Sequence, residues 1–248
     1  MKISNYLHRI GLTNVKENNL ETLKLLQMNH LLHVPFENLD VIHHVPIPLN
    51  IETYYKKIVT NHRGGFCYEL NGLFNWLLQQ LQYNCYLVAA TVLRPDGSWS
   101  MERSHAAQIV ELDEPYFVDV GFGDSARMPL PLTGEVKEDV SGKYRIQPID
   151  NNINELQREE SPNKWRTLLR IDMTPRKLSD FEEACHFNQT SPKSTFTQKE
   201  IMTMATKDGR YTLSDQELTI TKNGEKKQSI LSENEKQSIL QNFFGLTF

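Results

Sequence analysis

The strongest hydrophobic pattern of the chain lies between residues 70 and 81. Apolar side chains recur there every three or four positions, at Leu70, Leu73, Phe74, Leu77, Leu78 and Leu81. This spacing is typical of an amphipathic helix that packs on a core, so it predicts a helix over residues 70–81. Gly64 and Gly65 precede the helix and leave room for another molecule to approach the main chain. Cys67 therefore falls at or just before the first helical turn.

The first 60 residues predict further helices joined by turns. Leucines at helical spacing follow Asn19, and a second helix is predicted over residues 51–59 after Asn50; both asparagines are suitable N-caps. Residues 33–40 and 45–49 are rich in proline and predict turns without regular structure.

From residue 84 onward the pattern changes to that of β-strands. Segments rich in β-branched and aromatic residues predict strands over residues 85–93, 105–112, 116–120, 144–149 and 165–172. Residues 133–142 and 150–163 are polar and predict connections. Strands that follow one another in this way favour an antiparallel sheet or a small barrel.

The last 70 residues predict a smaller mixed unit. Ser179 with Glu182 forms the sequence signature of a capping box for a helix that runs to about His186. Strands that form a small meander are predicted over residues 194–206, 211–213 and 217–221. Ser232 with Glu235 then predicts the start of a final helix that ends near Phe244.

Composition and charge narrow the class of protein. The 248 residues are 39% hydrophobic and 23% charged, with a formal net charge of −4, which is ordinary for a globular protein. No long basic run is present, which argues against a nucleic-acid partner. Neither a secretion signal nor an apolar run of membrane-spanning length is visible, so we expect a cytoplasmic protein without a membrane partner. The cysteines Cys67, Cys85 and Cys185 show no metal-ligand spacing, and no metal is predicted.

Three residues have the chemistry of a nucleophilic site. At a helix start, free N–H groups and the helix dipole favour a thiolate, which makes Cys67 a candidate nucleophile. Such a cysteine needs a base and a group that orients the base. His105 opens an apolar strand, and Asp119 lies within another, where a carboxylate is costly unless it is paired. A Cys67–His105–Asp119 triad is one hypothesis; the alternatives are that Cys67 only packs and that Asp119 bonds main-chain N–H groups.

Four stretches of the chain resemble the arylamine N-acetyltransferases. They are RGGFCYELNG at residues 63–72, PFENL at 35–39, DVGFG at 119–123 and the segment 191–196. The resemblance covers roughly residues 1–200 and fades beyond them. It implies an α+β multidomain fold with a papain-like site made of Cys67, His105 and Asp119. The implied domains are a helical bundle (1–83), a central antiparallel β-barrel (84–177), an interdomain helix (178–190) and a C-terminal α/β lid (191–248).

The resemblance also implies an activity. It is acetyl transfer from acetyl-CoA to an arylamine, arylhydrazine or heterocyclic amine, by a ping-pong mechanism through an acetylated cysteine. Phe36 and Phe122 match positions associated with the acceptor, and Gly123 and Ser125 are candidate contacts of coenzyme A. A papain-like or transglutaminase-like hydrolase remains an alternative, because a triad alone does not say whether water or an amine resolves the acyl-enzyme. A binding module without chemistry is a third reading.

The sequence also predicts an ion pair outside the candidate site. Arg63 and Glu37 are charged residues embedded in otherwise apolar or turn motifs. We expect them to form a structural ion pair that joins the first helical segments to the turn before Cys67.

Overall fold

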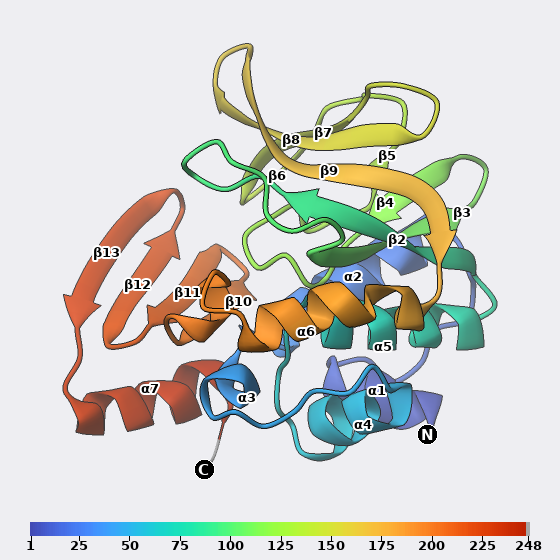
Figure 1. Ribbon diagram of the computed structural model, residues 1–248. Helices are drawn as coiled ribbons and strands as arrows, with labels where there is room; N and C mark the ends of the chain where they lie inside the picture. Colours follow the sequence, from blue (N-terminus) through green and yellow to red (C-terminus); the bar gives the residue numbers. More distant parts are fainter. Residues whose placement is uncertain (247–248) are drawn as a thin grey trace.

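The helices of the first 83 residues lie beneath the larger of two antiparallel sheets and beside the smaller one in the computed structural model, which describes residues 1–246 (Figure 1). Their bounds are α1 Ile3–Arg9, α2 Leu20–His33, α3 Leu39–Ile42, α4 Ile51–Tyr55 and α5 Cys67–Gln80. A π-helical turn over Lys56–Thr60 extends α4. The predicted N-caps are confirmed: the side chains of Asn19 and Asn50 accept hydrogen bonds from main-chain N–H groups three residues later, both at 2.9 Å. No helix of residues 1–246 is long and apolar enough to cross a membrane.

Helix α5 is the centre of the helical layer. The predicted helix over residues 70–81 is confirmed, but it begins one turn earlier, at Cys67. The Glu69 carboxylate accepts a hydrogen bond from the Phe66 N–H at 3.0 Å, which satisfies a donor at this end of the helix. The apolar stripe of α5 is buried against the first sheet and against the other helices. The helix start that carries Cys67 is therefore fixed by packing.

The first sheet is the predicted antiparallel barrel and is nearly closed. Its order is β5-β4-β3-β2-β9-β8-β7-β6. Its strands are β2 Asn84–Val92, β3 His105–Glu111, β4 Pro115–Val118, β5 Leu130–Pro131, β6 Lys137–Asp139, β7 Gly142–Pro148, β8 Ile153–Ser161 and β9 Lys164–Arg176. One face of this sheet packs on α5, and the other encloses a second core that includes Ile109, Tyr144 and Leu169.

The prediction of a polar connection over residues 150–163 was wrong. Residues Ile153–Ser161 form strand β8, which pairs with both β7 and β9. Only Ile153 and Leu156 are apolar in this strand. Most of the other side chains are partly buried or exposed, so polar residues are tolerated at these positions. The alternation of apolar and polar residues that indicates a strand is therefore too weak here to predict β8 from the sequence. The 133–142 connection likewise contains the short strand β6.

The interdomain helix differs in detail from the prediction. A 3₁₀ turn over Leu178–Phe181 leads into α6, Glu182–Thr190. The residues that cap the turn are Lys177 and Asp180, whose carboxylate accepts from the Lys177 N–H at 2.9 Å, so the predicted pairing of Ser179 with Glu182 was wrong. The helix also runs one turn past His186.

The second sheet has the order β1-β10-β11-β12-β13. Its strands are β1 Phe36–Glu37, β10 Ile201–Thr206, β11 Gly209–Ser214, β12 Glu217–Lys222 and β13 Glu225–Ile230, and helix α7, Glu233–Phe244, covers one of its faces. The predicted start of the last helix at Ser232 is confirmed: Ser232 is the N-cap of α7, and its N–H donates to the Glu235 carboxylate at 2.7 Å. The predicted strand over residues 194–206 was too long, since Thr195–Thr197 is a 3₁₀ turn.

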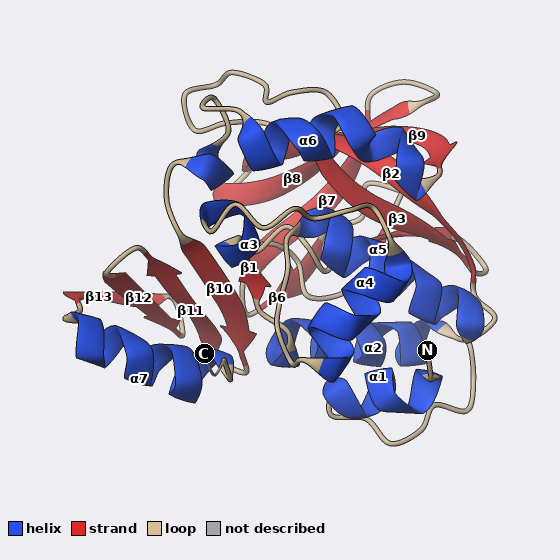
Figure 2. Cartoon of the chain, turned by 60° about the horizontal axis from the view of Figure 1, so that its bottom comes forward, coloured by secondary structure: helices blue, strands red, loops and turns tan. Residues whose placement is uncertain are grey.

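Strand β1 ties this C-terminal sheet to the N-terminal helices (Figure 2). Residues 33–40 were expected to lack regular structure, but Phe36 pairs with Thr203 of β10 and also forms a bridge with Gly65. Gly64 packs so closely here that a Cβ would lie 2.1 Å from the Pro35 carbonyl oxygen. The two glycines before Cys67 therefore make room for the chain itself and not for another molecule.

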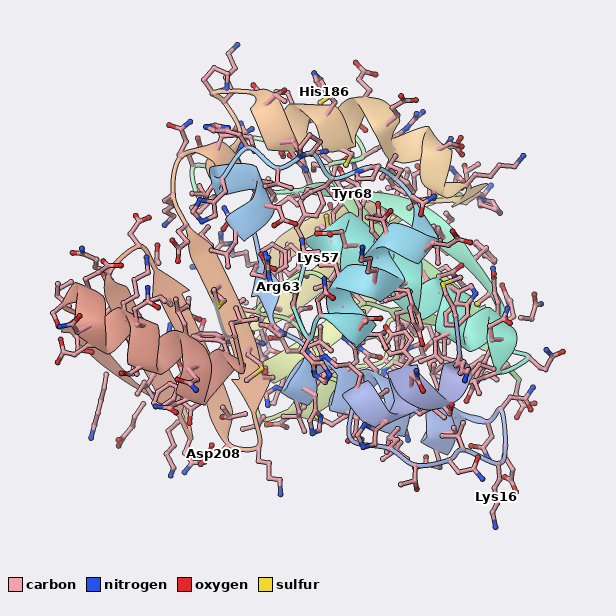
Figure 3. All side chains as sticks on the ribbon, turned by 90° about the horizontal axis from the view of Figure 1, so that it is seen from below. Lys16, Lys57, Arg63, Tyr68, His186 and Asp208 are labelled. Carbon is pink, nitrogen blue, oxygen red and sulfur yellow. The ribbon has the colours of Figure 1, made fainter. Side chains whose placement is uncertain are left out.

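The predicted ion pair of Arg63 with Glu37 is present and belongs to a larger network. Arg63 Nη2 lies 2.8 Å from Glu37 Oε1 and 3.0 Å from Asp40 Oδ1. Lys57 Nζ lies 2.7 Å from Asp40 Oδ2 and 2.9 Å from Glu69 Oε1. Glu37 is fully buried, and Figure 3 shows Lys57 and Arg63 close together. The network joins the strand β1 region, the π-helical turn after α4 and the start of α5.

Arg63→Ala should destabilise the protein by about 3 kcal/mol, the lower end for breaking a buried ion pair, because Lys57 remains 3.8 Å from Glu37. The melting temperature should fall by roughly 6–12 °C. The matched control is Arg166→Ala, which removes an exposed pair with Glu160 and should cost less than about 0.5 kcal/mol. Equal melting temperatures for the two variants in a thermal scan would contradict a structural role for the network.

Candidate active site

Cys67 is the first residue of α5 and is 2% exposed. Its Sγ lies 3.8 Å from the carbonyl oxygen of Ser104, the residue before β3. The loop after β4 comes close to the same turn, since a Cβ on Gly121 would lie 2.8 Å from the Cys67 Cα. Only glycine permits this approach. The first N–H groups of α5 have no acceptor within the helix and are available at this point.

His105 and Asp119 form a buried pair beside Cys67. His105 is the first residue of β3, and Asp119 directly follows β4, the neighbouring antiparallel strand. His105 Nε2 lies 2.7 Å from Asp119 Oδ2. With Nε2 donating to the carboxylate, the other ring nitrogen is left for the thiol. The structure thus brings together the three residues that the sequence singled out.

In the pair of His105 and Asp119, each charged side chain stabilises the charged form of the other. Burial opposes a charged imidazole, but the carboxylate of Asp119 and hydrogen bonds with Asp119 and Cys67 outweigh it and raise the pKa of His105 to about 10. Burial also opposes ionisation of Asp119, yet His105, Asn71 and the Gly121 N–H lower its pKa below the usual value. The pair therefore holds an imidazolium and a carboxylate at neutral pH.

Asn71 is a site residue that sequence reasoning missed. Its Nδ2 donates to Asp119 Oδ1 at 2.8 Å and to the Ala106 carbonyl at 2.6 Å, and its Oδ1 accepts from the Val120 N–H at 2.9 Å. Asp119 Oδ1 also accepts from the Gly121 N–H at 2.8 Å. Both sequence alternatives for Asp119 are therefore realised, one on each oxygen. The sequence did offer a signal for Asn71, because it is a polar residue one turn after Cys67 on a helix predicted to be buried.

Cys67 and His105 line a cavity of about 320 Å³ with aromatic walls, and Asp119 contacts His105 without lining the cavity itself. Cys67, His105, Phe36, Phe122 and Phe196 are among its lining residues. The Phe122 ring meets the His105 ring edge-on, with centroids 5.5 Å apart. Such a cavity suits a flat apolar ligand.

Of the two predicted contacts of coenzyme A, one lies at the cavity. Gly123 lines the cavity, whereas Ser125 is buried and is not among the lining residues. Asn188 of α6 was not predicted and does line it; its Nδ2 donates to the Ser104 carbonyl at 3.1 Å. Within residues 1–246, no group of three or more histidines, cysteines, aspartates or glutamates could hold a metal ion.

A cysteine at a helix start beside a buried histidine–aspartate pair on an antiparallel barrel defines a papain-like cysteine site in an α+β protein. An N-acetyltransferase family model matches residues 19–248, so the match extends past residue 200, where the motifs fade. The pineal gland isozyme of arylamine N-acetyltransferase from Gallus gallus is 31% identical, over 100% of this chain and 94% of its own length. The chain belongs to the arylamine N-acetyltransferase family.

Solved structures of the same family share the fold. An arylamine N-acetyltransferase from Bacillus cereus, described as having a unique Cys-His-Glu catalytic triad, superposes with a TM-score of 0.92 at 25% identity over 100% of both chains. This chain has Asp119 as the acid beside His105. The enzyme from Mycobacterium marinum in complex with CoA superposes with a TM-score of 0.90 at 29% identity, over 98% of this chain and 92% of that one.

Proposed function

We propose that this protein transfers acetyl groups from acetyl-CoA to the nitrogen of arylamines, arylhydrazines or heterocyclic amines, with Cys67, His105 and Asp119 as its catalytic residues. The observation that carries the proposal is the contact of a buried cysteine with a charged histidine–aspartate pair at an aromatic cavity. Family membership supports the choice of acetyl-CoA and an aromatic amine. Phe36 and Phe122 supply apolar walls for the ring of the acceptor.

The first half-reaction acetylates the enzyme. The Cys67 thiolate attacks the carbonyl carbon of the acetyl thioester, and the first N–H groups of α5 stabilise the oxyanion that forms. The carbon–sulfur bond to coenzyme A then breaks, and the imidazolium of His105 gives its proton to the departing thiolate. Coenzyme A leaves as a thiol, and Cys67 carries the acetyl group.

The second half-reaction regenerates the thiolate. The amine attacks the acetyl carbon, the imidazole of His105 takes the proton that the amine loses, and Cys67 departs as a thiolate. Asp119 stabilises the imidazolium that results. Because both half-reactions use one nucleophile, the kinetics are ping-pong.

Incubation with acetyl-CoA followed by intact-mass measurement tests the proposal. One acetyl adduct is expected, at Cys67 alone, because burial raises the pKa of Cys85 and of Cys185 to about 12 and keeps both thiols protonated. Addition of aniline should remove the adduct and yield acetanilide. Rapid release of acetate without an amine would favour the hydrolase, and an unmodified chain would favour the inert binding module.

The proposal also covers the partners of the protein and its cellular compartment. The substrates are small molecules, and a nucleic-acid partner is not part of it. The three cysteines are free, which supports a reducing compartment such as the cytoplasm.

A further inference from the structure

Asn188 of α6 is a buried polar residue at the cavity of Cys67 that the chemistry described above does not use. It is 3% exposed and lines that cavity. Its Nδ2 donates to the Ser104 carbonyl oxygen at 3.1 Å and to the Tyr68 hydroxyl at 3.3 Å. The Tyr68 hydroxyl in turn donates to the Arg103 carbonyl at 2.9 Å, so it accepts from Asn188. Both N–H groups of the Asn188 carboxamide are therefore engaged.

These hydrogen bonds fix the turn that leads into β3 and its first residue, His105. Arg103 has a φ of 60°, in the left-handed region that an arginine adopts at a cost, so neighbouring groups must hold the chain there. Tyr68 binds the carbonyl of Arg103, and Asn188 binds the carbonyl of the next residue. Tyr68 directly follows the nucleophile and lies between α5 and α6 (Figure 3). The cluster thus ties the helix of the nucleophile to the strand of the histidine.

The Ser104 carbonyl oxygen also acts on the thiol directly, because it lies 3.8 Å from Cys67 Sγ. An S–H group that donates to this oxygen does not donate to His105, and the oxygen repels a thiolate. The N–H of Asn188 occupies one lone pair of the oxygen and draws electron density from it. The oxygen then competes less for the thiol proton and repels the thiolate less. His105 is left as the better acceptor of the proton.

Other titratable groups interact with Cys67 but stay uncharged at neutral pH. Burial raises the pKa of each of them, to about 12 for the cysteine among them. The charged residues Arg94 and Asp124 line the same cavity, from the loops after β2 and β4. None of these groups is replaced in a variant of Asn188, so a change in the thiol of such a variant reports on the Asn188 hydrogen bonds. The uncharged groups are Tyr54 of α4, Tyr68 of α5 and Cys185 of α6.

We propose that Asn188 is a positioning residue of the active site. Together with Tyr68 it holds the turn before β3, so that the proton of Cys67 Sγ passes to the Nδ1 of His105 and is not shared with a main-chain oxygen. The inference rests on the proposed function, because it concerns the same nucleophile, but its main measurement needs no acetyl donor. Helix α6 thereby contributes to the reactivity of the site although it carries none of the three catalytic residues.

Asn188→Leu tests the proposal, because leucine has a similar size and donates no hydrogen bond. The measured quantity is the rate of Cys67 alkylation by iodoacetamide as a function of pH, followed by peptide mass. The rate at pH 7 should fall about fivefold, and its rise should move to higher pH by about 0.7 pH units, which is the scale of one lost hydrogen bond. In acetyl transfer kcat should fall by a similar factor, while KM for acetyl-CoA changes by less than about twofold.

Gln189→Leu is the matched control, because it loosens α6 without touching the site. Gln189 is the next residue of α6, and its side chain bonds the main-chain N–H and carbonyl of Ile47 at 2.7 and 3.1 Å. Its replacement should lower the melting temperature, as Asn188→Leu does. The pH dependence of Cys67 alkylation should stay that of the wild type. A loss of stability alone is thereby separated from a change at the thiol.

Tyr68→Phe is a second variant, which keeps the packing of the ring and should fold. It removes the bond to the Arg103 carbonyl and leaves the bond of Asn188 to Ser104, so alkylation should slow, but less than in Asn188→Leu. If Asn188→Leu does not fold, Tyr68→Phe decides alone. A wild-type alkylation profile in either folded variant, or an equal shift in Gln189→Leu, would overturn the positioning role and leave acetyl transfer standing. If the profiles shift as expected but acetyl-CoA leaves no adduct on the wild type, the proposed function fails and the positioning role stands.

Discussion

Cys67→Ser should lower kcat/KM for acetyl transfer by at least about 10⁴-fold and abolish the acetyl adduct, because a hydroxyl is far less ionised than a thiol beside the same histidine. The fold should be retained, since serine and cysteine have nearly the same shape and Cys67 sits at a helix start that packing already fixes. The measurements are acetanilide formation from acetyl-CoA and aniline, intact mass, and the melting temperature.

Cys185→Ser is the control for Cys67→Ser. Cys185 lies on α6, is buried like Cys67, and contacts Gln189 instead of a histidine. Its replacement should cost some stability and leave acetylation of Cys67 in place. Turnover at the wild-type rate in Cys67→Ser would remove the cysteine from the mechanism and revive the reading in which Cys67 only packs.

Local periodicity was sufficient to predict the helix that carries the nucleophile. The stripe from Leu70 to Leu81 repeats at helical spacing, and its burial against the barrel is what such a stripe requires. His105 and Asp119 could be singled out because polar groups inside apolar strands need partners. The sequence of a single segment does not give the register in which two strands pair. His105 and Asp119 meet because β3 and β4 pair, and the pairing fixes which residues lie side by side.

The features that the sequence did not predict depend on distant segments. Strand β1 is two residues long and exists because β10, more than 160 residues later, pairs with it. The alternation of Arg210, Thr212, Thr219 and Thr221 is readable in the sequence, but a polar strand face ordinarily means contact with water. Only the position of the barrel edge opposite this face makes it the wall of a cavity between the barrel and the C-terminal sheet.

Asp119→Asn should lower kcat/KM by on the order of 10⁴-fold, the scale known for a serine-protease triad that loses its carboxylate charge. The pKa of His105 should fall, because the carboxylate that raises it is gone. The thiolate–imidazolium pair would then be less populated at neutral pH. Asp119→Glu keeps the charge and should retain more activity than Asp119→Asn, at a cost from misplacing the bonds to Asn71 and Gly121.

The matched control for Asp119→Asn is Asp113→Asn, in the turn between β3 and β4, where a side chain without a triad partner should tolerate the change. The rate of Cys67 alkylation by iodoacetamide should shift to higher pH in Asp119→Asn only. Stability gives a second readout. A folded pKa of about 10 for His105, against the usual 6.5, means that the stability from this pair declines as pH rises between those values. Asp119→Asn should flatten that decline, and a variant that keeps both the alkylation profile and the pH dependence of stability would show that another group orients His105.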